Sequence, residues 1–178
     1  MKKRTVLFVD DEENFLNAVK RVLMDEPFET LFATNSKQAM EILQNQEIHV
    51  IVADIRMPGI SGLELLEKVK CEFPHVIRLI LSGDAQSETV LEAINKGEVF
   101  RYIPKPCKME KELKAIIRQA IDYYHLHSER AMLMSYLEQL INGEKLDDIN
   151  LQLIRTLITE RNKNLYKWSE ACTSTANR

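Results

Sequence analysis

Five polar side chains of the sequence lie where short apolar runs end: Asp10, Asp11, Asp54, Ser82 and Lys105. Three carboxylates brought within a few ångströms of one another repel, and a hard divalent cation relieves that repulsion. Mg²⁺ suits a few carboxylates together with water and phosphate oxygens. A lysine adds a mobile positive charge, and a serine adds a hydroxyl donor. Brought together, this set could hold a phosphoryl group on an oxygen nucleophile.

These residues can cooperate only if the apolar runs are strands of one sheet. The runs are short and mostly apolar, which is typical of strands buried on both faces, and they cover 5–9, 28–33, 49–53, 76–81 and 99–103. Apolar residues at helical spacing lie between the runs and follow the last one. This alternation predicts a parallel sheet with helices on both faces and right-handed crossovers. The carboxyl ends of parallel strands share one edge, where open α/β sheets place their ligand sites.

Asp54 stands at the centre of this arrangement. It follows the buried run Val50–Ala53 and precedes Pro58 and Gly59, which break the chain before a helix expected over 61–72. A carboxylate at the end of a buried strand is costly unless something pairs with it. By itself such an aspartate would equally suit a turn cap. The other polar strand ends favour a site instead.

The composition predicts an ordinary globular protein. The 178 residues are 45% hydrophobic and 29% charged, with a net charge of −3, and the length suggests one domain with an appendage. No apolar run approaches the ~18 residues of a membrane helix, and the run after the basic N-terminus stops at Val9. We therefore expect a cytoplasmic chain that is neither exported nor inserted in a membrane. Cys71, Cys107 and Cys172 are far apart and lack metal-ligand spacing, which indicates reduced thiols.

Four motifs carry a family resemblance: VDDEE at 9–13, ADIRMPGISGLELL at 53–66, LSGDA at 81–85 and RYIPKP at 101–106. In this order and spacing they resemble the receiver domain of two-component response regulators, over about residues 4–124. The resemblance implies a flavodoxin-like, doubly wound α/β fold with five parallel strands in the order 2-1-3-4-5. It also implies a histidine kinase or a phosphotransfer protein as the partner that supplies a phosphoryl group.

The resemblance further implies a role for each residue of the site. Asp54 would accept the phosphoryl group. Asp11 would bind Mg²⁺ directly, Asp10 would act largely through water, and the main-chain carbonyl of Arg56 would be a further ligand. Arg56 and Asp84 occupy positions that vary in the family, and they could pair across the site and slow hydrolysis. Because a receiver performs part of the transfer chemistry itself, the sequence leaves open whether the chain counts as an enzyme.

Three further roles follow from the same resemblance. Ser82 would be the switch hydroxyl that hydrogen-bonds the phosphoryl group, Lys105 would pair with a phosphoryl oxygen, and Tyr102 would be the switch aromatic residue. The bond between Lys105 and Pro106 would be cis. Other interpretations stay open: Asp10 could cap the first helix, Lys105 could be a solvated surface lysine, and Tyr102 could be a half-buried core residue.

The sequence after residues 1–124, the receiver-like part, predicts a helical extension over 125–170 and a disordered tail over 171–178. The last receiver helix begins near Met109, and apolar residues at helical spacing continue it to about Gly143. His125 lacks a set of metal-ligand partners, and we expect it to be an exposed helix residue.

A second helix is predicted after Asp147 or Asp148, either of which can cap it. Its apolar residues from Leu151 to Trp168 follow heptad spacing for fewer than about three heptads. A helix this short is marginal in water unless its apolar stripe is buried. We therefore expect a helical homodimer, or a complex with a partner, through the stripe from Leu126 to Trp168.

No output domain is recognisable in the extension. After residue 124 the chain carries seven acidic and seven basic residues, whereas nucleic-acid-binding domains usually present a basic face, so we do not expect nucleic acid as a partner. The principal prediction is a response regulator that is switched by phosphorylation and acts through its C-terminal helices. Two alternatives stay open: the receiver part of a transcription regulator, or of a cyclic-dinucleotide signalling enzyme, whose output domain is missing from the sequence.

Overall fold

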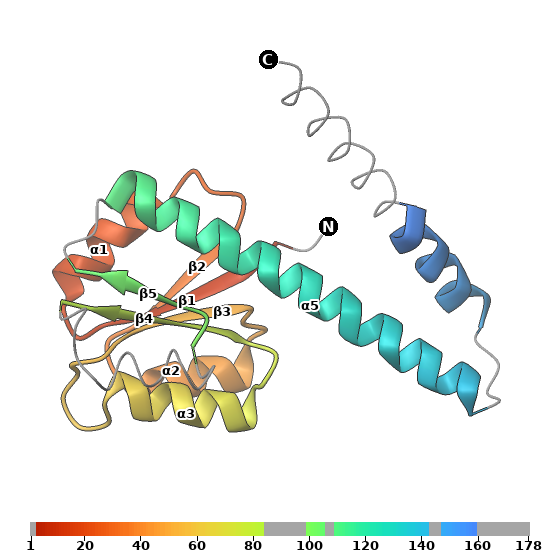
Figure 1. Ribbon diagram of the computed structural model, residues 1–178. Coiled ribbons are helices and arrows are strands. Elements are labelled where there is room, and N and C mark those ends of the chain that lie inside the picture. The colour runs from red at the N-terminus through yellow and green to blue at the C-terminus, as the bar shows by residue number, and fades with distance from the viewer. Residues whose placement is uncertain (1–2, 84–98, 106–108, 143–146, 160–178) are drawn as a thin grey trace, which may run out of the picture. The chain divides into compact units, whose positions relative to one another are not determined.

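The computed structural model describes residues 3–83, 99–105, 109–142 and 147–159. Its core is a sheet of five parallel strands in the order β2-β1-β3-β4-β5 (Figure 1). The strands are β1 (Thr5–Val9), β2 (Glu29–Ala33), β3 (Val50–Asp54), β4 (Ile77–Ser82) and β5 (Arg101–Pro104). The predicted sheet and its strand order are therefore confirmed.

Helices cover both faces of this sheet (Figure 1). On one face lie α2 (Ser36–Asn45) and α3 (Gly62–Glu72). On the other face lie α1 (Glu13–Val22) and the first turns of α5 (Lys114–Ile141). This two-sided cover is the doubly wound arrangement that the alternation of strands and helices predicts.

Successive residues of the central strands face opposite cores. Leu7 and Ile51 are buried with the apolar residues of α2 and α3, whereas Phe8 and Val52 are buried with those of α1 and α5. Burial on both faces explains why the strand sequences are continuous apolar runs without polar alternation. It also fixes the register, so that β1 and β3 end at the same edge of the sheet.

Local side chains define where α2 and α3 begin. Asn35 accepts a hydrogen bond from the backbone N–H of Gln38 at 2.9 Å. Ser61 accepts one from the N–H of Glu64 at 3.3 Å, and the Glu64 carboxylate accepts one from the N–H of Ser61 at 2.8 Å. This reciprocal capping box fixes the direction in which α3 leaves the loop after β3. It thereby supports the loop between Asp54, the last residue of β3, and the start of α3.

Several predicted boundaries differ from the structure. Asp54 and Ser82 are the last residues of β3 and β4 rather than the residues after them, because the ladder continues beyond the apolar run. β5 begins at Arg101, two residues later than predicted. The helix expected to begin near Met109 opens with a π-helical turn, Met109–Leu113, before α5.

Some predictions concern residues outside the described ranges, and one is wrong. The helix expected between the apolar runs 76–81 and 99–103, and the peptide bond between Lys105 and Pro106, lie outside the part of the chain that the structure describes. His125, predicted to be exposed, is half-buried because Arg4 lies against its ring at 3.2 and 3.3 Å. These two residues are 121 positions apart, so no local pattern announces the contact.

Gly62 is required where α3 passes the end of β3. A Cβ atom at this position would lie 1.9 Å from the carbonyl oxygen of Asp54, which is backbone and cannot move aside. We expect Gly62→Ala to lower the free energy of unfolding by about 3 kcal/mol. Gly59→Ala is the matched control. Gly59 has open space around it, and the only cost of a side chain there is backbone strain at its φ of +80°. This variant should therefore lose about 1 kcal/mol of its free energy of unfolding. Urea unfolding measures the stability of both variants. Equal losses of stability would contradict the close approach of Gly62 to the carbonyl oxygen of Asp54.

The chain divides into two compact units, residues 1–125 and 126–178. In the second unit the structure describes the last turns of α5 and a helix over 148–159. Asp147 accepts a hydrogen bond from the N–H of Asn150 at 2.7 Å, which confirms the predicted cap.

Apolar side chains remain uncovered in this second unit. Leu126, Leu137, Leu140 and Ile158 are 48 to 51% exposed. A polar contact joins the two helices, since the Tyr136 hydroxyl donates to the side-chain oxygen of Asn150 at 2.9 Å. None of the helices in the described ranges is long and apolar enough to cross a membrane.

Candidate functional site

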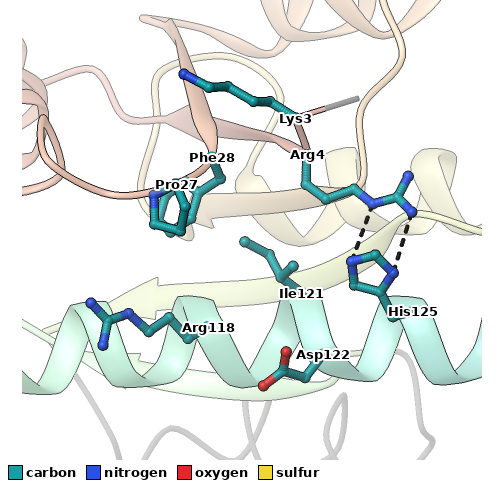
Figure 2. A pocket seen from close by; sticks show the side chains of 8 residues that line it. All are labelled: Lys3, Arg4, Pro27, Phe28, Arg118, Ile121, Asp122 and His125. Atoms are coloured by element: carbon teal, nitrogen blue, oxygen red, sulfur yellow. Dashed lines mark hydrogen bonds between the residues drawn. The ribbon is translucent and has the colours of Figure 1, made fainter. Parts of the chain in front are cut away.

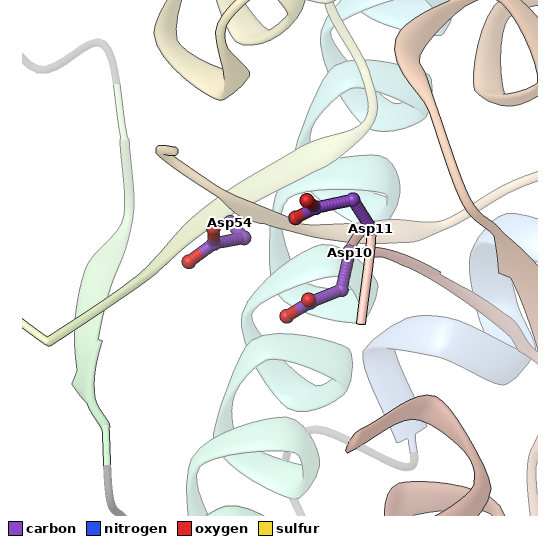
Figure 3. A group of neighbouring side chains, drawn as sticks. All are labelled: Asp10, Asp11 and Asp54. Carbon is purple, nitrogen blue, oxygen red and sulfur yellow. The ribbon is translucent and has the colours of Figure 1, made fainter. Parts of the chain in front are cut away.

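Asp10, Asp11 and Asp54 come together at the carboxyl edge of the sheet (Figure 3). Asp10 and Asp11 follow β1, and Asp54 ends the neighbouring strand β3. One carboxylate oxygen from each residue lies within 4.8 Å of the other two. Asp10 and Asp54 are only 1% and 6% exposed, whereas Asp11 is exposed. The cluster therefore combines two buried carboxylates with one that faces solvent, and its hard oxygen donors suit Mg²⁺.

Lys105 closes the other side of this cluster. Its ammonium nitrogen lies 2.5 Å from a carboxylate oxygen of Asp10 and 3.1 Å from one of Asp54. The backbone N–H of Lys105 donates to the carbonyl oxygen of Ser82 at 2.7 Å, so β4 positions the lysine. Lys105 is therefore not the solvated surface lysine that the sequence left open.

Electrostatics at Asp54 and Lys105 reflect their burial. Burial raises the pKa of Asp54 above its ordinary value, and Asp10 adds to the rise, although the hydrogen bond and charge of Lys105 oppose it. Burial alone would lower the pKa of Lys105, but hydrogen bonds and charges from Asp10 and Asp54 outweigh it and raise the pKa. The lysine thus stays charged, while the charge of Asp54 is only partly compensated.

We expect Asp54→Asn to raise the free energy of unfolding at neutral pH, because it removes a buried charge that is only partly compensated. Because the pKa of Asp54 is raised in the folded state, the folded chain binds the proton more tightly than the unfolded chain does. Stability therefore falls as the pH rises from the unfolded pKa through the folded pKa. The gain from Asp54→Asn should be complete above this window and absent below it.

Urea unfolding at neutral and acidic pH measures this difference. Asp25→Asn, at an exposed loop position, is the control and should change little at either pH. If Asp54→Asn is less stable at neutral pH, or gains the same stability at both pH values, the charge of Asp54 is not under-compensated in the folded chain.

Ser82 and Tyr102 are joined across β4 and β5. Ser82 ends β4 and is buried, and the Tyr102 hydroxyl donates to the Ser82 carbonyl oxygen at 2.9 Å. Tyr102 is half-buried and packs against the core beneath α2 and α3. Both the switch role and the core role that the sequence left open for Tyr102 fit this position.

The turns after β1 and β3 orient their carboxylates. Asp10 accepts a hydrogen bond from the N–H of Glu12 at 3.0 Å, and Asp54 accepts one from the N–H of Arg56 at 3.1 Å. The first helix has Glu12 as its N-cap residue and no side-chain cap, so Asp10 is not its cap. Each aspartate therefore has one carboxylate oxygen held by its own turn.

Phe15 belongs to the site, although the sequence placed it only among the apolar residues of the first helix. The ammonium nitrogen of Lys105 lies 4.6 Å from the centre of its ring, within cation–π distance. An aromatic residue in the first turns of a helix that directly follows two aspartates was the available signal. The ring gives Lys105 a third favourable contact beside the two carboxylates.

The comparisons with known proteins agree with this geometry. The model of the response regulator receiver domain family matches residues 6–118. The hydrogenase transcriptional regulatory protein HoxA of Cupriavidus necator is 35% identical over 128 residues, which are 72% of this chain and 26% of that protein. The chain spans about a quarter of the length of the curated relatives it matches.

Two solved structures are also similar. One is described as an adenylate cyclase from Rhodopirellula baltica: it has a TM-score of 0.71 and 33% identity, over 75% of this chain and 98% of that one. The other is the response regulator TrrA from Thermotoga maritima in complex with Mg²⁺ and BeF, with a TM-score of 0.59 and 26% identity, over 66% and 98%. The chain belongs to the response regulator receiver family. It carries a receiver domain of two-component signalling.

Proposed function

We propose that the receiver is switched by transfer of a phosphoryl group to Asp54 from a histidine kinase or a phosphotransfer protein. The observation that supports it is a buried carboxylate with an ammonium group 3.1 Å away and two further carboxylates within 4.8 Å. A carboxylate oxygen of Asp54 would form a bond to phosphorus while the bond from phosphorus to the donor's nitrogen breaks. The product is an acyl phosphate on the chain and an unmodified histidine on the partner.

The donor set of the site fits Mg²⁺, which would offset the negative charge of the phosphoryl oxygens when it is bound. Asp11 faces solvent and is proposed as a direct ligand, with Asp54 and the main-chain carbonyl of Arg56 beside it and Asp10 acting through water. The similar structure in complex with Mg²⁺ and BeF supports Mg²⁺ as the ion for this site. Lys105, already within contact of Asp54, would pair with a phosphoryl oxygen.

The switch would start at Ser82 and reach Tyr102. A phosphoryl group adds negative charge and strong acceptor oxygens at the sheet edge, and the Ser82 hydroxyl would move to donate to it. The Tyr102 hydroxyl is bonded to the backbone of Ser82 at 2.9 Å, so movement of β4 would release or redirect the ring. A difference of a few kcal/mol between two states is enough for phosphorylation to reverse their populations.

The proposed organisation is a receiver domain over 1–124 and a helical extension over 125–170 that transmits the signal. Residues 171–178, for which the sequence predicts a disordered tail, lie outside the part of the chain that the structure describes. The exposed apolar side chains of the extension support a helical homodimer of coiled-coil type. The proposed location of the chain is the cytoplasm, as the sequence predicts. The name of the similar HoxA, a transcriptional regulatory protein, favours control of transcription as the second candidate, through parts that this sequence does not contain.

Acetyl phosphate, a small phosphoryl donor, tests the first proposal on the full chain. With Mg²⁺ present, intact-mass measurement should show one added phosphoryl group per chain, and excess chelator should prevent it. A chain that stays unmodified both with acetyl phosphate and with a cognate kinase would contradict the proposed function.

Sedimentation of the full chain with and without beryllofluoride tests the dimer. We expect a dimer whose affinity or geometry depends on beryllofluoride, and a monomer when the chain is cut after Tyr124. Leu137→Glu should weaken the dimer at least about tenfold, because it places a charge on the apolar stripe. Glu138→Gln, at the neighbouring exposed position, is the control. A full chain that is monomeric in both states would contradict the proposal.

A further inference from the structure

A second concave site is lined by eight residues near the starts of β1 and β2 (Figure 2). Asp54 lies at the end of β3, which is the opposite edge of the parallel sheet. The cavity has a volume of about 550 Å³. One wall is formed by Lys3 and Arg4 before β1, another by Pro27 and Phe28 before β2, and the third by the α5 segment 118–125. Since the β1 strand separates it from the aspartate cluster by about 16 Å, the cavity is not part of the phosphoryl site. Its volume falls in the range of small-molecule sites.

The floor of this cavity is apolar and its rim is positively charged. Phe28 is buried and Ile121 points from α5 toward it, so a flat apolar group could pack there (Figure 2). The Arg118 charge is matched, because its guanidinium donates twice to the carboxylate of Glu26, at 2.8 and 2.9 Å. The other charged groups of the lining are the cations of Lys3 and Arg4 and the carboxylate of Asp122. The balance around the cavity is positive.

Arg4, whose guanidinium also lies over the ring of Tyr124, gives the wall more N–H donors than its two imidazole neighbours can accept. Each of the three guanidinium nitrogens of Arg4 lies near an imidazole nitrogen. Two of them contact the two ring nitrogens of His125, at 3.3 and 3.2 Å, and the third contacts Nε2 of His49 at 3.1 Å. A guanidinium only donates, and a neutral imidazole has one accepting nitrogen. In His49 that nitrogen is Nδ1, which accepts the backbone N–H of Thr5 at 3.0 Å. At most one of the three contacts is therefore an ordinary hydrogen bond, and an acceptor in the cavity would relieve the others.

We propose that this cavity binds a small organic anion, a carboxylate or a phosphate monoester carried on a compact apolar body. The anionic head would contact Lys3 and Arg4, where charge-assisted hydrogen bonds are the strongest polar contacts available. The body would cover Phe28 and Ile121. Such a ligand touches the segments before β1 and β2 and the α5 helix at once, so its binding stabilises the packing of α5 on the receiver.

An NMR titration of the full chain with simple probes tests this proposal. Benzoate and phenyl phosphate should give saturable amide shifts at residues 3–5, 27–29 and 118–125, and the tighter of the two identifies the head group. Benzamide, which has the shape of benzoate without its charge, should bind about tenfold more weakly. Inorganic phosphate, which lacks the apolar body, should also bind more weakly. Equal binding of benzamide, or no saturable shift at these residues with either anion, would overturn the proposal.

Two exposed charges of the lining give effects of opposite sign at low ionic strength. Lys3→Gln should weaken binding of the tighter anion about threefold, and Asp122→Asn should strengthen it about threefold. Lys68→Gln, an exposed lysine of α3 outside the cavity, should leave the affinity unchanged. Spectra of the free variants show that each is folded. If all three variants bind alike, the anion is not held by this rim and the proposal fails.

Discussion

Asp54→Asn should take up no phosphoryl group under conditions that modify the unaltered chain. The amide of asparagine keeps the size of the side chain but has no nucleophilic carboxylate oxygen. The substitution leaves the contact between Asp10 and Lys105 in place, so the loss would be chemical rather than structural. Intact-mass measurement after incubation with acetyl phosphate and Mg²⁺ gives the modified fraction directly.

The control for this substitution is Asp25→Asn, which removes an exposed carboxylate that is not part of the aspartate cluster. It should be modified as fully as the unaltered chain. If Asp54→Asn is modified equally well, Asp54 is not the acceptor.

Asp11→Ala should lower the affinity for Mg²⁺ at least about 100-fold and abolish Mg²⁺-dependent phosphorylation. Asp11 is the exposed member of the cluster, so its carboxylate can reach a hydrated ion at little cost. Asp10 and Asp54 would remain, but Lys105 already contacts both of them and competes with a cation. Mg²⁺ titration followed by tyrosine or tryptophan fluorescence, together with the modified fraction, measures both effects.

Asp25→Ala is the matched control for this second variant and should bind Mg²⁺ like the unaltered chain. Full phosphorylation of Asp11→Ala, or of the unaltered chain in excess chelator, would remove the proposed metal role. We expect Asp11→Ala to fold like the unaltered chain, because the side chain of Asp11 is exposed.

The fold and the meeting of the aspartates follow from local patterns. The runs around Leu7 and Ile51 are apolar at nearly every position, which is typical of strands buried on both faces. Parallel pairing then places Asp10 beside the end of the Asp54 strand, since strands of one direction finish at one edge. Both steps need nothing beyond residue order and spacing.

Contacts between distant segments were beyond such reasoning. The position of Phe15 against Lys105 depends on how α1 lies over the end of β5, and helical spacing alone assigns Phe15 to the core. The contact of Arg4 with His125 depends on the exact turn of α5 that reaches the start of β1. The close approach of Gly62 to Asp54 likewise appears only when the loop is folded.

The most direct measurement is the position of the phosphoryl group on the unaltered chain. The full chain is incubated with acetyl phosphate and Mg²⁺, the acyl phosphate is reduced with borohydride, and the peptides are mapped by mass spectrometry. Reduction converts a phosphorylated aspartate to homoserine, which marks the acceptor permanently. Conversion of Asp54 and of no other aspartate is the predicted result. A phosphoryl group on a different residue, or conversion at Asp10 or Asp11 in place of Asp54, would contradict the account.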